Sequence, residues 1–300
     1  MDRASYFILN KALFGSFPDQ QSVKHLEEIG VRYFIDLTNH NETKTIPYTT
    51  NYNYLKYPIL DRKIPEDWCS FAALIVRLCD LLKRTDGKLY IHCKGGHGRS
   101  GIVVACVLCY YFKMNPEEAL KKTNEFHNDR KEMKEKWRKI GSPQSKRQKD
   151  FVHRFFRSLK YTSSYNDINF PFSNNSDHQV TIPEVGTFPN AYFAYQYYKS
   201  PDDSRYTENL KNRISNNSDI IDEWEDRKIN YMYNILKLKF TQHIELKNML
   251  LNSGLRPLCK ISIDKFWGDG FDGTGLNHHG KLLQKIRREM LYLLPQHDEP

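Results

Sequence analysis

The amino-acid sequence predicts two domains, an α/β domain with a central sheet flanked by helices, followed by a mainly α (α+β) domain. Its 300 residues exceed the usual size of one compact domain. In the first half, apolar runs typical of buried strands alternate with apolar residues at helical spacing. The charge also differs: residues 1–158 contain 28 Lys and Arg against 18 Asp and Glu, a balance of +10, whereas residues 159–300 contain 17 against 18, a balance of −1. We therefore expect separate folds at 1–158 and 165–296.

The elements of the first half follow from local patterns. Two short runs rich in β-branched and aromatic residues, "VRYFIDLT" at 31–38 and "KLYIHC" at 88–93, indicate buried strands. The segment 67–84, "DWCSFAALIVRLCDLLKR", repeats apolar residues at helical spacing. In "MNPEEALKKTNEF", Asn115 is a typical N-cap and Pro116 suits the first turn, so we expect a helix there.

In the second half, the pattern changes around 163–179, "SSYNDINFPFSNNSDHQ", which is rich in turn-forming residues. We place a linker at 159–170. Helices are expected in the segments 229–240 and 243–252. A Gly- and Asp-rich loop then precedes a terminal helix within 276–294.

Composition excludes several classes of protein. No apolar stretch approaches the roughly 20 residues of a membrane span, and the first residues lack a cleavable signal pattern, so we expect a cytoplasmic or nuclear protein. Five of the six cysteines lie in the first half, mostly within apolar helical patterns, which argues against disulfides. Cys106 and Cys109 form a C-x-x-C that fits core packing better than zinc. We expect no metal and no cofactor.

The basic balance of the first half favours anionic partners. Its densest part, 129–149, mixes both signs at spacings that suit helix pairs, so a solvated basic face is the favoured interpretation. Nucleic-acid binding by this cluster stays a minor alternative.

The strongest chemical signal is the loop after the second strand, "HCKGGHGRSG" at 92–101. Glycines 95, 96 and 98 let consecutive N–H groups turn inward as an anion-binding nest, and a helix that begins near Ser100 or Gly101 adds its partial positive charge. Arg99 can grip two phosphate oxygens with its planar fork. The same field favours the thiolate of Cys93, a strong nucleophile. The sequence therefore predicts a phosphate held against a thiolate.

Such chemistry also needs an acid on a separate loop to protonate the leaving oxygen. Asp61, in "YPILDRKIPEDW", is our candidate because its Asp-x-x-x-Pro setting resembles the acid loop of the cysteine-dependent phosphatases. Glu66 and Asp67 are alternatives, but they sit where a helix begins and are better explained as its N-terminal charges.

The pattern Cys93-x5-Arg99-Ser100 preceded by His92 resembles the signature of the cysteine-dependent protein tyrosine and dual-specificity phosphatases. The resemblance implies that Cys93 attacks phosphorus, Arg99 holds the oxygens, Asp61 acts as acid and then base, and Ser100 assists the second step, without a metal. It also implies a phosphate-binding loop made of the following residues: His92, Lys94, Gly95, Gly96, His97, Gly98 and Gly101. His92 would orient this loop, and Gln148 in "GSPQSKRQKDF" is a candidate for positioning water.

Lys94 and His97 make the loop more basic than phosphate capture requires. They could favour multiply charged substrates such as phosphoinositides, nucleotides or RNA ends. Alternatively, their side chains point at solvent or at neighbouring acids, and the substrate stays open.

Three segments of the second half, 188–199, 232–243 and 266–287, resemble the NADAR family, whose members bind or cleave NAD- and ADP-ribose-related N-glycosides. The resemblance implies that a base stacks on an aromatic beside the Gly- and Asp-rich loop. The ligand or catalytic candidates are as follows: Trp267, Asp272, Asn277, Lys281, Gln196, Glu184 and Tyr192.

This sequence departs from the NADAR pattern at one position. Tyr192 stands where the family usually has a glutamate, and a neutral tyrosine cannot stabilise an oxocarbenium-like state as a carboxylate does. Glu184, Asp272 or Asp264 could substitute, or the domain could bind without catalysis.

The leading prediction is a cysteine-dependent phosphatase acting on phosphorylated protein, fused to a NADAR-like domain for an ADP-ribose- or NAD-related ligand. The alternative is a phosphatase for lipid, nucleotide or RNA phosphomonoesters, with a second half that only binds ADP-ribose.

Overall fold

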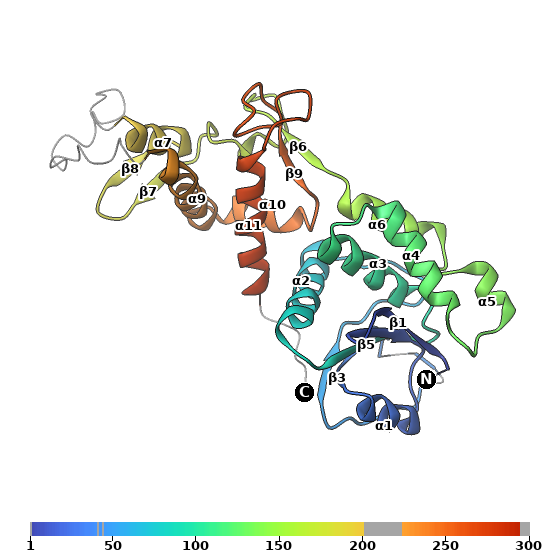
Figure 1. The fold of residues 1–300 in the computed structure, drawn as a ribbon. Coiled ribbons are helices and arrows are strands. Elements are labelled where there is room, and N and C mark those ends of the chain that lie inside the picture. The colour runs from blue at the N-terminus through green and yellow to red at the C-terminus, as the bar shows by residue number, and fades with distance from the viewer. Residues whose placement is uncertain (1, 41, 44, 201–223, 295–300) are drawn as a thin grey trace. The chain divides into compact units, whose positions relative to one another are not determined.

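The computed structural model describes residues 2–40, 42–43, 45–200 and 224–294. The chain divides after Arg157 into two compact units, the second of which spans Ser158–Met290 (Figure 1). Each unit has its own sheet or sheets and its own buried core.

The N-terminal unit is built on a five-stranded sheet of order β1-β2-β5-β3-β4. Its strands are β1 (Ala4–Ile8), β2 (Ala12–Gly15), β3 (Val31–Asp36), β4 (Asn53–Lys56) and β5 (Lys88–His92). Only the β1–β2 pair is antiparallel, and β5 lies between β2 and β3 with parallel register to both. The strands predicted at 31–38 and 88–93 are confirmed. Because β3, β4 and β5 run parallel, the loops that follow them leave the same edge of the sheet.

Six helices accompany this sheet. They are α1 (Gln20–Glu28), α2 (Trp68–Arg84), α3 (Arg99–Phe112), α4 (Pro116–Asn128), α5 (Glu135–Ile140) and α6 (Lys146–Phe156). In Figure 1, α1 covers one face of the sheet, and α2, α3, α4 and α6 cover the other. The predicted cap is confirmed: the side chain of Asn115 accepts from the amide of Glu118 at the start of α4. Asp67, predicted as an N-terminal charge of its helix, is the cap of α2.

Helix α3 is buried from Arg99 to Cys109, because it packs against the sheet and against α2, α4 and α6. This burial explains Cys106 and Cys109, which are free thiols inside the core, as the apolar pattern predicts. The helix begins at Arg99, slightly earlier than the expected Ser100 or Gly101. No cluster of three or more metal-ligating side chains occurs in the described ranges.

Helix α6 is fixed by aromatic packing. Phe151 and Phe155 lie 5.5 and 5.3 Å from Phe71 of α2, measured between ring centroids, and Trp68 contacts both. Removing one such buried ring typically costs about 3–5 kcal/mol of the free energy of unfolding. The N-terminal turn of α6 is thereby held beside the loop that follows β5.

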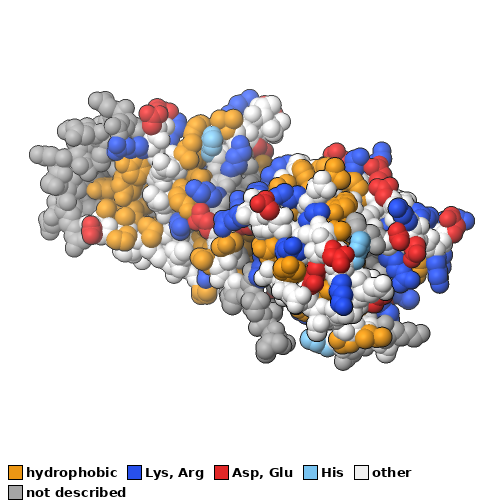
Figure 2. All heavy atoms as spheres, turned by 60° about the horizontal axis from the view of Figure 1, so that its bottom comes forward, with side chains coloured by type: hydrophobic (Ala, Val, Ile, Leu, Met, Phe, Trp, Pro, Cys, Tyr) orange, Lys and Arg blue, Asp and Glu red, His pale blue; other side chains and the backbone are white. Residues whose placement is uncertain are grey.

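The basic segment at 129–149 folds into α5 and the start of α6, and most of its charged side chains are exposed. On the face seen in Figure 2, Lys and Arg side chains alternate with Asp and Glu rather than forming one continuous basic area. This mixture is the arrangement expected of a solvated face.

The C-terminal unit is mainly helical. Its strands form two small sheets: β6 (Leu159–Tyr161) with β9 (Leu258–Lys260), and β7 (Val180–Ile182) with β8 (Gly186–Phe188). Its helices are the 3-10 turn η1 (Phe170–Phe172), α7 (Ala191–Lys199), α9 (Trp224–Gln242), α10 (Ile244–Asn252) and α11 (His278–Tyr292). The helices expected at 229–240, 243–252 and within 276–294 correspond to α9, α10 and α11.

The structure differs from the expected linker at 159–170. Residues 159–161 form β6, which pairs in parallel with β9, and Leu159 and Tyr161 are buried. The buried hydroxyl of Tyr161 hydrogen-bonds to Nδ1 of His279, 2.6 Å away. Turn-rich composition concealed a three-residue strand, because such a short run carries no readable periodicity.

In the part of the chain that the structure describes, no helix combines the length and the apolar surface that crossing a bilayer requires.

Candidate active site

Cys93 directly follows β5 and lies beneath the N-terminus of α3. Its side chain is buried, and Sγ lies 3.6 Å from Oγ of Ser100, in the first turn of that helix. The backbone N–H groups of a first helical turn have no partner within the helix, and the helix dipole adds partial positive charge there. The loop 93–98 is therefore placed where an anion is favoured.

Two glycines of this loop lie where neighbouring segments approach closely. Gly96 has φ +72°, and a Cβ there would lie 2.4 Å from the carbonyl carbon of Gly15. At Gly98 a Cβ would lie 2.8 Å from Nε2 of Gln148. The loop is thus pressed between the end of β2 and the start of α6: a side chain at 96 would displace the backbone, and one at 98 would displace the side chain of Gln148.

Arg99 is buried, and its guanidinium spans several segments. Nη1 donates to the carbonyl oxygen of Ile59 at 3.0 Å, and Nη2 donates to Oδ1 of Asp61 at 3.0 Å. Burial opposes the charged form, but the hydrogen bond to Glu42 and the nearby anions outweigh it and raise the pKa of Arg99. The residue is a permanent buried cation at the edge of the loop.

Glu42 was not predicted from the sequence. Both of its carboxylate oxygens accept from Arg99, Oε1 from Nη1 and Oε2 from Nη2 at 3.0 Å. Burial opposes its ionisation, yet the Arg99 hydrogen bond and the amide of Asn39 hold the pKa of Glu42 below its usual range. The sequence feature that could have pointed to Glu42 is its position after the strand β3. The carboxyl ends of neighbouring parallel strands meet at one edge of a sheet, so residues that follow β3 lie near those that follow β5.

Asp61 lies on the loop between β4 and α2, with its side chain 53% exposed. The structure therefore brings together Cys93, Arg99 and Asp61 from two separate loops. Asp67, one of the two alternatives, accepts from the amides of Cys69 and Ser70 as the cap of α2. Glu66 is exposed beside it.

His92 is fully buried beneath the loop. Its Nε2 lies 2.7 Å from the hydroxyl of Tyr48, and its Nδ1 lies 3.7 Å from Oδ1 of Asp36. Burial lowers the pKa of His92 to about 4, although Asp36 opposes the shift. The neutral ring thus links the end of β5 to Tyr48, which lies between β3 and β4 in the same segment as Glu42.

The two basic residues of the loop behave differently from each other. Lys94 is partly exposed, and its backbone carbonyl accepts from the amide of Phe17 at 3.1 Å. His97 turns to neither solvent nor an acid: its Nδ1 lies 2.7 Å from Nε2 of His127, and its ring stacks on Trp137. Burial lowers the pKa of His97 to about 4. The expectation that His97 adds positive charge is therefore wrong at neutral pH.

Gln148 is fully buried in the first turn of α6 and faces the loop at Gly98. Its Nε2 donates to the carbonyl oxygen of Lys63 at 3.2 Å, but its buried Oε1 has no hydrogen-bond partner among the residues that the structure describes. A buried acceptor without a partner is costly unless a water or ligand supplies a donor.

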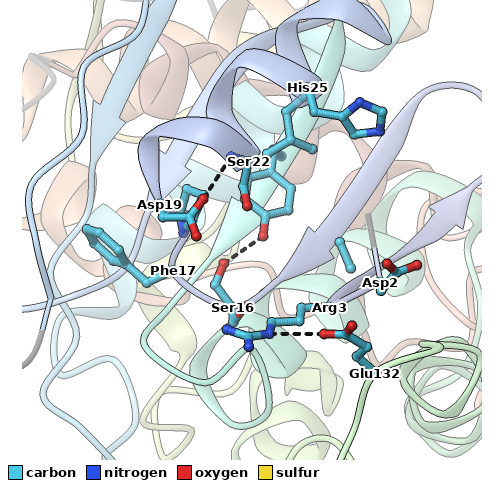
Figure 3. A pocket seen from close by; sticks show the side chains of 12 residues that line it. Asp2, Arg3, Ser16, Phe17, Asp19, Ser22, His25 and Glu132 are labelled. Carbon is cyan, nitrogen blue, oxygen red and sulfur yellow. Dashed lines mark hydrogen bonds and ion pairs between the residues drawn. The ribbon is translucent and has the colours of Figure 1, made fainter.

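A separate cavity of about 260 Å³ lies on the side of the loop nearest Ser16 and Phe17. In Figure 3 its walls carry the Arg3–Glu132 ion pair and the hydrogen bond between Asp19 and Ser22. These groups satisfy one another, and Cys93, Arg99 and Asp61 do not line the cavity. It is distinct from the candidate site.

In the C-terminal unit, one of the predicted residues, Trp267, lies in an aromatic group with α7. The ring of Trp267 meets Tyr195 of α7 edge-on, with centroids 5.6 Å apart, and Gln196 follows on the same helix. Asp264 fixes Trp267 by accepting from its amide at 2.9 Å. Tyr192, in the first turn of α7, is 38% exposed.

The remaining predicted residues of this unit are engaged elsewhere or exposed. The amide side chain of Asn277 donates to the carbonyl oxygen of Leu258 and accepts from the amide of Lys260, which ties β9 to the start of α11. Asp272 is exposed, and its hydrogen bonds with Thr274 and Lys265 lower its pKa. Glu184 lies in the turn between β7 and β8 with φ +63°, and Lys281 is exposed on α11.

The buried loop 171–176 supports α7 from beneath. Lys239 of α9 donates to the carbonyl oxygens of Pro171 and Ser173, at 2.8 and 2.6 Å, and burial lowers its pKa to about 7. Asn174 contacts Nε2 of His279 with its side chain and accepts from the amide of Tyr192 with its carbonyl. Sequence reasoning missed these supporting residues, since each reads as a core or turn position.

Comparisons with known proteins agree with this division. Residues 8–152 match the family described as "Swiss Army Knife protein, DSP-PTPase phosphatase domain", and residues 155–291 match the NADAR domain. "Putative tyrosine phosphatase 197R" of Invertebrate iridescent virus 6 is 36% identical over 256 residues, which are 84% of this chain and 83% of that protein. "N-glycosidase YbiA" of Shigella flexneri is 29% identical over 131 residues, 40% of this chain and 80% of that one. The crystal structure of Tk-PTP in the active form covers 50% of this chain and 93% of its own, with 21% identity and a TM-score of 0.41.

Proposed function

Because the chain belongs to the same family as the 197R protein and consists of a DSP-PTPase phosphatase domain followed by a NADAR domain, we propose that it removes phosphate from phosphorylated proteins through a phosphocysteine at Cys93. The observation that carries the proposal is the contact between Nη2 of Arg99 and Oδ1 of Asp61, 3.0 Å long. This contact supports the proposal because the carboxylate of Asp61, from another loop, lies beside the cation of the Cys93 loop.

The first step transfers the phosphoryl group to sulfur. The Cys93 thiolate forms the S–P bond while the bond from phosphorus to the leaving oxygen breaks. Arg99 and the loop amides hold the non-bridging oxygens, and the carboxyl proton of Asp61 passes to the leaving oxygen. An arriving phosphate accepts from the same edge of Arg99 that Asp61 contacts, so substrate binding would free Asp61 for this transfer.

The second step releases inorganic phosphate. Water attacks phosphorus, its proton passes to Asp61, and the S–P bond breaks to return the thiolate. The Oγ of Ser100, 3.6 Å from Sγ, is placed to donate to that thiolate. The unpaired Oε1 of Gln148 is an acceptor that can orient the attacking water.

The test measures phosphate release from phosphotyrosine and phosphothreonine peptides. Phosphoinositides and nucleotides are assayed in parallel as the alternative classes of substrate. We expect peptides to be the better substrates, Cys93→Ser to abolish release and Asp61→Ala to slow it. The proposal would be overturned if every substrate released phosphate equally well and if that release did not depend on Cys93.

For the C-terminal unit, we propose binding of an ADP-ribose- or NAD-related ligand with its base against Trp267. The edge-on contact with Tyr195 and the Asp264 hydrogen bond hold this ring in place. Titration calorimetry with ADP-ribose tests the proposal: Trp267→Ala should weaken binding at least tenfold, whereas Phe271→Ala, which removes an exposed ring of the same loop, should not.

A further inference from the structure

The fourth residue after Cys93 is held by two helices that lie outside the phosphate loop. The ring of His97 stacks on Trp137 of α5, with centroids 4.6 Å apart and planes inclined by 16°. The ring of His127, fully buried at the end of α4, meets it edge-on at 5.0 Å. The same His97 ring lies against Gly95, where a Cβ would be 2.9 Å from its Cδ2.

The hydrogen bonds assign the tautomers of the two histidines. Nδ1 of His127 lies 3.3 Å from Oδ1 of Asn128, so this nitrogen carries the proton and Nε2 is an acceptor. Nδ1 of His97 then donates to Nε2 of His127 over 2.7 Å. Burial and the nearby Arg130 lower the pKa of His97 to about 4 and that of His127 to about 3, so the pair is neutral at pH 7.

The backbone of His97 is held by the same region of the chain. Oγ of Ser142 donates to the carbonyl oxygen of His97 at 2.6 Å, and the amide of Ser142 donates to Oδ1 of Asn124 in α4 at 3.0 Å. Arg138 of α5 donates to the carbonyl oxygen of Asn128 at 2.5 Å. The end of α4, α5 and residue 142 therefore form one bonded support around His97.

We propose that His127 and Trp137 are positioning residues that set the direction of the phosphate-loop amides through His97. The inference rests on the proposed phosphatase function of that loop. Gly95, Gly96 and Gly98 have no side chains that could anchor this stretch of backbone, so the side chain at 97 is a fixed point of residues 95–98, in addition to the close backbone contacts of the loop. Losing that point would move amides that must meet the phosphate oxygens, and a displacement of about 1 Å can cost on the order of 100-fold in rate.

The experiment compares disruptive and conservative variants of both residues. His127→Leu removes the acceptor, whereas His127→Gln keeps an amide oxygen near the position of Nε2. Trp137→Ala removes the stacking surface, whereas Trp137→Phe keeps it. Lys121→Ala and Lys139→Ala change exposed side chains on the same two helices and serve as matched controls.

Three readouts are measured on the full chain: kcat and KM with p-nitrophenyl phosphate, the rate of Cys93 alkylation by iodoacetamide at pH 6, and protection against alkylation by tungstate. For His127→Leu and Trp137→Ala we expect kcat/KM to fall by about 10- to 100-fold and tungstate protection to weaken by a similar factor. The conservative variants His127→Gln and Trp137→Phe should keep kcat/KM and tungstate protection within about threefold of wild type. The control variants Lys121→Ala and Lys139→Ala should do the same.

The inference would be overturned if both disruptive variants kept wild-type values of kcat/KM and tungstate protection. It would also be overturned if the conservative variants lost as much as the disruptive ones. If His127→Leu does not fold, His127→Asn takes its place, because its amide is too short to reach His97. If wild type binds tungstate but releases no phosphate, the proposed function fails, while alkylation and protection still test the support of the loop.

Discussion

The carboxylate of Glu42 contacts the guanidinium of Arg99 end-on, with both oxygens accepting from the two terminal nitrogens. Glu42 is nearly buried, its side chain 9% exposed, and it comes from the segment after β3. The end-on contact fixes the plane of the guanidinium and directs its Nε edge away from Glu42. A phosphate in the loop can then be gripped by that edge.

Replacing Glu42 by Gln should therefore weaken catalysis without touching the nucleophile. We expect kcat/KM to fall at least tenfold, because a neutral amide satisfies only part of the buried Arg99 and leaves its plane less constrained. Steady-state kinetics measure the effect. Glu66→Gln, which neutralises an exposed acid near Asp61, is the control and should change kcat/KM less than threefold.

Asp61→Asn should lower kcat/KM, which reports the first chemical step, by about 10²–10⁴-fold for a poor leaving group, since a general acid contributes in that range. The loss should be much smaller with p-nitrophenyl phosphate, whose leaving group needs little protonation. Comparing it with phenyl phosphate measures the difference. A uniform loss on both esters would assign Asp61 a structural role instead.

Gln148→Leu should slow breakdown of the phosphocysteine more than its formation. The variant loses the buried oxygen that has no partner in the described part of the chain, and with it the acceptor proposed for water. Rapid-quench kinetics should then show a burst of leaving group followed by slow turnover, and mass spectrometry should find phosphorylated Cys93. A single-phase time course without the phosphorylated species would contradict this role.

Stability of the N-terminal unit should fall as the pH drops below about 6.5. Burial lowers the pKa of His92 and His97 to about 4 and that of His127 to about 3, whereas histidine in an unfolded chain titrates near 6.5. Below that pH the unfolded state binds more protons, so the contribution is complete at neutral pH and is lost on acidification, by up to about 1.4 kcal/mol per pH unit for each buried histidine.

Hydrogen exchange of α3 amides in urea at pH 7 and pH 5 measures this slope. The charges facing these histidines are Arg130 and Arg138 beside the His97–His127 pair, and Asp36, Lys56 and Arg99 beside His92. His127→Gln removes one titrating group and should flatten the slope. An unchanged slope in that variant would contradict the assignment.

Tyr192→Glu should raise N-glycoside cleavage by the C-terminal unit. The substitution restores a carboxylate at an exposed position of α7, where it can stabilise positive charge developing on a ribose. Release of nicotinamide from NAD, compared with wild type and with Tyr192→Gln, measures the gain. If the Glu and Gln variants are equal, position 192 does not supply the missing charge.

Part of the N-terminal fold could be predicted because its signals are local. The strands that contain Phe34 and Ile91, the helix start at Asp67 and the cap at Asn115 depend on residues a few positions apart, and the structure contains all of them, whereas β1, β2, β4 and α1 were not predicted. The second half was less readable. Strand β6 is only three residues long, and its pairing with β9 joins Leu159 to Leu258, so no local pattern announces it.

The sequence by itself determined the chemistry expected at Cys93, since a thiol, glycines, an arginine and a helix start within nine residues define a phosphate loop wherever the chain places them. Tertiary structure alone decided which distant groups complete it. Glu42 reaches Arg99 across 57 residues, His127 reaches His97 across 30, and Gln148 reaches Lys63 across 85. These contacts arise because parallel strands deliver their loops to one edge and packed helices bring remote segments beside them, relations in space that residue spacing does not encode.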